Sequence, residues 1–81
     1  MMARNISRLI DMKNGARVRI ISIEGEPGFT IKLNRIGVYT GDTARVVRRA
    51  PFDGPILLDV RGMEIALGKN IASHIMVEVL G

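Results

Sequence analysis

The feature that most constrains the fold is a helix stop inside a chain of otherwise β character. Residues 33–41, LNRIGVYTG, contain two glycines, Gly37 and Gly41. Gly37 stands where a helix ends in a left-handed conformation, which glycine adopts without steric cost. Gly41 directly precedes residues 42–50, whose Thr-Ala-Arg-Val-Val core favours a strand. One short helix within a β domain is therefore expected.

The predicted helix covers residues 29–36. Phe29, Leu33 and Ile36 recur at i, i+4 and i+7, which places them on one helical face. We expect this face to pack on the sheet. Ile31 does not share that face, so it lies at the periphery or contacts a partner.

The remaining apolar residues alternate as they do in β-strands. The pattern predicts five strands, at residues 17–23, 42–50, 56–61, 63–67 and 75–79, joined by turns rich in glycine, proline and aspartate. Many short strands with short turns are typical of a small barrel or sandwich. The chain is therefore expected to be mainly β.

Local irregularities add detail to this pattern. The alternation changes phase at Ile20 and Ile21, which predicts a bulge or strong bend. The residues Asp53-Gly54 are expected to make a tight reversal, and Gly62 to mark a hairpin. Near the N-terminus, residues 6–10 carry apolar side chains at helical spacing, which predicts a short helical turn. Residues 68–74 are expected to form a short turn or 3₁₀ segment.

Length and composition limit the class of protein. With 81 residues the default is one domain, residues 1–81, with a thin core. There is no cysteine, which excludes disulfides, thiolate metal sites and cysteine nucleophiles and suits a cytoplasmic protein. No apolar run approaches the ~20 residues that span a bilayer. A soluble protein without a secretory signal is expected.

The search for catalytic chemistry finds no usable constellation. His74 is the single histidine, and a lone histidine is more often a boundary residue than a ligand. The acid pairs Glu24/Glu26 and Asp53/Asp59 leave room for weak, transient divalent-metal binding, but solvated loop acids are more typical. No phosphate-loop or dinucleotide motif is present. We expect no enzyme and no cofactor.

Charge leaves a nucleic-acid alternative open. The chain carries 12 Lys+Arg against 8 Asp+Glu, a net charge of +4 that favours an acidic partner. The two signs are interspersed, and the aromatic residues lie outside the strands, so no stable nucleic-acid binding is expected. Four arginines nevertheless fall in one predicted region of the sheet, and residues 60–62, VRG, are similar to the second motif of Sm-like RNA-binding proteins. The arginines are Arg45, Arg48, Arg49 and Arg61.

Taken in order, the motifs resemble those of the ferrous iron transport protein A (FeoA) family. They are LNRIGVYTG at 33–41, RRAP at 48–51, RGMEIAL at 61–67 and ASHIMV at 72–77, and the resemblance covers about residues 10–79. It implies a small SH3-like β-barrel with a short helix inserted between its first two strands. The same barrel is also the C-terminal domain of DtxR-like repressors. The family commonly has leucine where Ile36 stands and proline where Thr40 stands.

The resemblance also implies a function in iron homeostasis. The family implies a cytoplasmic accessory role in bacterial ferrous iron uptake, with FeoB, a GTPase-permease of the inner membrane, as the partner. We expect docking through the outward side of the helix, Ile31, Lys32 and Arg35, with Tyr39 in the following loop. The alternatives are that these are ordinary exposed residues and that the chain is an Sm-like RNA-binding module. An exposed sheet edge would allow a homo-oligomer.

Overall fold

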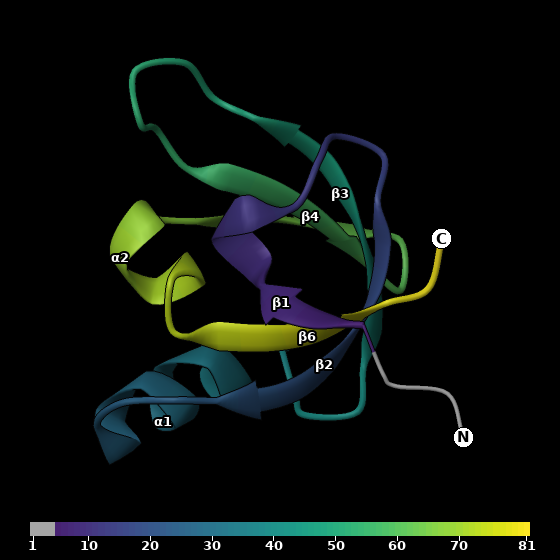
Figure 1. Cartoon of the computed structure of the whole chain (residues 1–81). Helices are drawn as coiled ribbons and strands as arrows, with labels where there is room; N and C mark the ends of the chain where they lie inside the picture. The colour runs from purple at the N-terminus through teal and green to yellow at the C-terminus, as the bar shows by residue number, and fades with distance from the viewer. Residues whose placement is uncertain (1–4) are drawn as a thin grey trace.

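A computed structural model describes residues 5–81. Six strands form one antiparallel sheet in the order β1-β6-β2-β3-β4-β5, and this sheet curls on itself (Figure 1). The bounds, in chain order, are β1 Ile6–Arg8, η1 Leu9–Asp11, β2 Arg17–Ile23, α1 Pro27–Arg35, β3 Thr43–Arg49, β4 Ile56–Val60, β5 Met63–Leu67, α2 Lys69–Ala72 and β6 Ile75–Val79. The predicted mainly β, SH3-like architecture with one inserted helix is confirmed, although the strand pairings do not close the sheet.

The prediction of five strands was one short, because β1 was read as a helical turn. Ile6 pairs with Glu78 of β6 and is exposed, whereas Leu9 opens the 3₁₀ turn η1 and is fully buried. A segment this short cannot offset the cost of nucleating a helix, but it can hydrogen-bond to the outer edge of β6. The helix α1 consequently lies between the second and third strands rather than between the first two.

The bend predicted in β2 is confirmed. The register between β2 and β6 shifts between Ile20 and Ser22, and Ile20 is buried while Ile21 is only half-buried. Before the shift β2 also pairs with β3, but after it the strand pairs with β6 alone. The shift therefore lies just beyond the point where β2 stops pairing with β3, a few residues before the chain leaves the sheet to form α1.

The helix α1 ends in a Schellman motif, which agrees with the helix end predicted at Gly37. Gly37 has a φ of +99°, the amide of Val38 donates to the carbonyl of Leu33 at 2.9 Å, and the amide of Gly37 donates to Asn34 at 3.1 Å. This turn brings Val38 back beside Leu33, and both are fully buried. The expectation that Ile36 packs on the sheet was wrong, because Val38 occupies the core and Ile36 remains 43% exposed.

The reversal between β3 and β4 differs in detail from the prediction. Its left-handed residues are Phe52 and Asp53, with φ of 59° and 58°, and the amide of Gly54 donates to the carbonyl of Pro51 at 3.1 Å. These angles fit the central positions of a type I′ turn. Gly54 serves a different purpose, since a Cβ there would fall 2.7 Å from the Cβ of Ala50.

The strands β4 and β5 form the predicted hairpin. Arg61 and Gly62 make its two-residue turn, with φ of 52° and 81°, and the amide of Gly62 donates to Asp59 Oδ1 at 2.9 Å. The predicted turn at residues 68–74 contains the four-residue helix α2, whose Ala72 is buried. The turn of this hairpin reaches the loop that follows α1, which is where the candidate site lies.

Candidate docking surface

The four residues predicted for docking are all exposed. Ile31 is 57% exposed and shares the outward face of α1 with Arg35, four residues later, while Lys32 is exposed beside them. Tyr39 is 47% exposed in the loop that follows the helix. An exposed isoleucine flanked by two cations is thus present on α1.

Tyr39 belongs to a different part of this surface. None of the polar contacts of the described residues joins its side chain to Ile31, Lys32 or Arg35. Two further apolar residues are exposed near Gly37: Ile36 is its neighbour in sequence, and a Cβ built on Gly37 would lie 3.3 Å from Met63 Cε. We call Ile36, Tyr39 and Met63 the exit-loop patch. Apolar periodicity placed Ile36 in the core and Met63 in a strand, so neither residue was predicted for this surface.

A hydrogen-bonded clamp holds this loop in place. Arg61 Nη1 forms an ion pair with Asp42 Oδ1 at 2.7 Å, and Arg61 Nη2 donates to the carbonyl of Gly37 at 2.7 Å. Asp42 Oδ2 accepts a hydrogen bond from the amide of Tyr39 at 2.9 Å. One arginine of the β4–β5 turn therefore fixes both ends of the segment that presents Tyr39.

The helix α1 itself has fewer interactions with the rest of the protein than the exit loop has. Its one fully buried residue is Leu33, and Phe29 stacks on His74 with ring centroids 4.7 Å apart. A Cβ at Gly25, whose φ is +94°, would fall 2.9 Å from both rings. The ring nitrogen Nδ1 of His74 lies 2.8 Å from the carbonyl of Asn70. The single histidine thus packs α1 against the segment that follows α2.

The arginines of the RNA alternative do not form a free cluster. Arg49 donates to the carbonyls of Ile10 and Met12, and Arg61 belongs to the clamp. Arg45 and Arg48 have no such contact among residues 5–81. The tripeptide VRG that resembles an Sm motif closes the β4–β5 hairpin, so its arginine has a structural role here.

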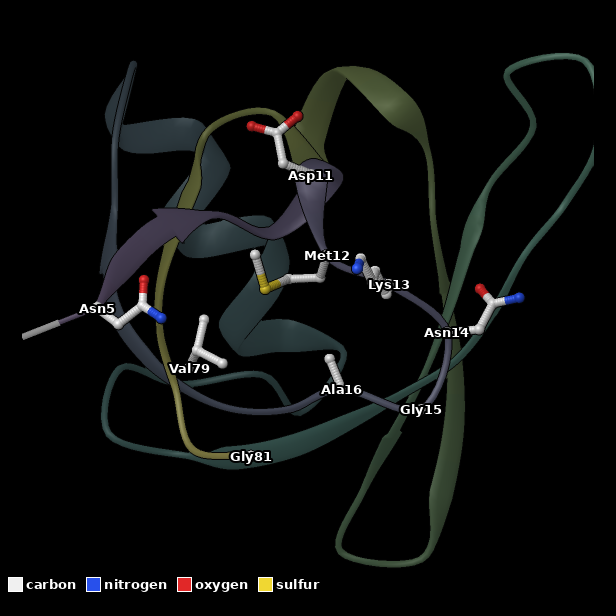
Figure 2. Close-up of a pocket in the computed structure, with 9 residues that line it drawn as sticks. All are labelled: Asn5, Asp11, Met12, Lys13, Asn14, Gly15, Ala16, Val79 and Gly81. Atoms are coloured by element: carbon white, nitrogen blue, oxygen red, sulfur yellow. The ribbon is translucent and has the colours of Figure 1, made fainter.

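A hollow of the described surface lies elsewhere, between η1 and the C-terminal end of β6. It measures about 530 Å³, and Met12, Ala16 and Val79 line its apolar part. In Figure 2 the Met12 side chain points toward Asn5 and Val79, whereas Asp11 and Asn14 point away from it.

The described residues do not assemble a metal site. Within residues 5–81 no three side chains of the His, Cys, Asp or Glu type come close enough to hold an ion. Asp53 pairs with Lys69 at 3.3 Å, and Asp59 caps the hairpin turn. None of the helices described in this range is long and apolar enough to cross a membrane.

Comparison with known proteins decides the family. The family model described as FeoA domain matches residues 7–79. The chain belongs to the FeoA family. A Methanocaldococcus jannaschii protein named as an Fe(2+) transport protein A is 32% identical over 66 residues, which are 82% of this chain and 78% of that protein.

Solved structures agree with this membership. The FeoA-like protein of Clostridium acetobutylicum is 30% identical, with a TM-score of 0.85 over 99% of this chain and 92% of that one. A manganese-dependent transcriptional repressor in complex with manganese has a TM-score of 0.88 over 96% of this chain and 38% of its own, at 24% identity. The repressor shares the fold of this chain in the part that the comparison covers.

Proposed function

We propose that this FeoA-family chain is a cytoplasmic accessory protein of ferrous iron uptake that acts by docking on the transporter FeoB. The observation that carries the proposal is the family membership, together with a relative named for Fe(2+) transport. In this role the chain is neither an enzyme nor the carrier of a resident cofactor. It binds at the cytoplasmic face of the membrane through its partner.

The proposed contact surface is the outward face of α1 continued by the exit-loop patch. Ile31 and Tyr39 supply exposed apolar area, and Lys32 and Arg35 surround Ile31 with positive charge. Central apolar and aromatic residues carry most of the energy of protein interfaces, and arginine is enriched there. A complementary surface on FeoB would be apolar with an acidic rim.

A pull-down with the cytoplasmic domain of FeoB tests the proposal. We expect Ile31→Asp and Arg35→Glu each to weaken binding at least tenfold, because one buries a charge in the contact and the other reverses the charge of its rim. Phe52→Asp is the matched control: Phe52 is fully exposed on the β3–β4 connection, which lies at the other end of the molecule from α1 in Figure 1. It should bind as the unmodified chain does.

Three results would count against the proposal in different ways. Unchanged binding by well-folded Ile31→Asp and Arg35→Glu would refute this surface, and loss of binding in Phe52→Asp would indicate a nonspecific effect. Failure of the unmodified chain to bind the FeoB domain would refute the partner.

A further inference from the structure

A second surface of the chain has unusual charge placement. On the outer face of the sheet, Arg17 of β2 and Arg45 of β3 are register partners, directly opposite one another. Cross-strand partners have Cβ atoms about 5 Å apart, and like charges in this position destabilise a sheet. Both side chains are exposed, and neither guanidinium has a hydrogen bond or ion pair with another residue in the described range 5–81.

The two arginines line a small hollow. It measures about 200 Å³, and its wall also includes Thr43, Asp59, Arg61 and Leu80. Arg61 is neutralised by Asp42 in the clamp, and the carboxylate of Asp59, opposite Arg45 on β4, accepts the amide of Gly62. The net positive charge of the hollow thus rests on Arg17 and Arg45, with Asp59 opposing it.

We propose that this hollow binds a small multivalent oxyanion of the phosphate type, held between the guanidinium groups of Arg17 and Arg45. A guanidinium presents paired N–H donors that match two oxygens of one phosphate, and two of them can share one tetrahedral anion. The anion removes the repulsion between the opposed arginines, so binding also stabilises the fold. This site is separate from α1 and does not depend on the proposed role in iron uptake.

The test is an NMR titration of the ¹⁵N-labelled chain with inorganic phosphate, in a buffer whose ionic strength is matched with sodium chloride. We expect saturable shifts at Arg17 and Arg45 with phosphate and none with chloride. Arg45→Gln should weaken binding about tenfold, as loss of a charge-assisted contact does. Asp59→Asn should strengthen binding several-fold, because it removes the opposing charge but keeps an oxygen for Gly62. Pyrophosphate in place of phosphate tests whether the hollow takes a larger oxyanion.

Arg48→Gln is the matched control, since Arg48 is exposed on the same strand but does not line the hollow. Thermal unfolding gives an independent readout. Without phosphate, Arg45→Gln should melt no lower than the unmodified chain. Phosphate should raise the melting temperature of the unmodified chain more than that of Arg45→Gln. Equal weakening by Arg48→Gln, or equal shifts with phosphate and chloride, would show general charge screening and overturn the proposal. A lack of any effect of Asp59→Asn would also contradict it.

Discussion

Substitutions of Asp42 test whether the clamp, the contacts of Arg61 with Asp42 and with the carbonyl of Gly37, positions the exit loop. The side chain of Asp42 is only 15% exposed and has two partners, Arg61 and the amide of Tyr39. Asp42→Ala removes both interactions, whereas Asp42→Asn removes the charge and retains an oxygen for the amide. The two variants therefore separate the ion pair from the hydrogen bond.

The expected changes in the free energy of unfolding follow from the solvent exposure of the two side chains. The Arg61 side chain is 52% exposed, so its pair with Asp42 should stabilise the fold by about 0.5–1 kcal/mol. The hydrogen bond from the amide of Tyr39 should contribute about 1 kcal/mol. We expect Asp42→Ala to lower the free energy of unfolding by about 2 kcal/mol and Asp42→Asn by about 1 kcal/mol. For a chain of this size each kcal/mol corresponds to roughly 4–8 °C in Tm.

Urea unfolding of Asp42→Ala, Arg61→Ala and the double variant completes a thermodynamic cycle. The expected coupling energy is about 0.5–1 kcal/mol, and 1 M salt should reduce it because the Debye length falls to about 3 Å. A coupling energy within about 0.3 kcal/mol of zero would mean that Arg61 is simply solvated. The exit loop would then owe its shape to the Schellman motif and to the hydrogen bond from the Tyr39 amide to Asp42.

Two further predictions concern left-handed residues, and thermal unfolding measures both. Gly37→Ala should lose about 1–2 kcal/mol, because φ is +99° and the new methyl would press on Met63; no loss would contradict the helix-stop geometry. Phe52→Asn should gain about 0.5 kcal/mol, because Phe52 is fully exposed with φ of 59°, a conformation that asparagine tolerates better; a lower Tm would count against the type I′ turn.

Local chemistry explains which parts of the fold could be predicted from the sequence. The stop at Gly37, the bend after Ile20 and the hairpin at Gly62 each depend on a few adjacent residues, and all three are confirmed. The strand at Ile6 was missed because its stability comes from pairing with β6, which is remote in the chain. Ile36 was misplaced for a related reason: periodicity cannot show that a Schellman turn brings Val38 into the core instead.

In the candidate site, too, local features could be predicted from the sequence and tertiary contacts could not. Exposure of Ile31 and Arg35 could be predicted, because both lie opposite the buried Leu33 on a single helix. The ion pair between Asp42 and Arg61 joins residues that are 19 positions apart, and no sequence period links them. The position of Met63 beside Gly37 depends on the same tertiary contact and left no signal in the apolar pattern.

The two parts of the proposed surface are held in place to different degrees by the rest of the protein, which affects how each would bind a partner. A partner gains less from a contact that must first be ordered than from one that is already fixed. Tyr39 follows the buried Val38, and its own amide is bonded to Asp42, so its backbone is held before any partner arrives. Ile31 projects from a helix that is anchored mainly by Leu33 and by the stacking of Phe29. Preorganisation therefore favours the exit-loop patch as the centre of the proposed interface, with the cations of α1 at its rim.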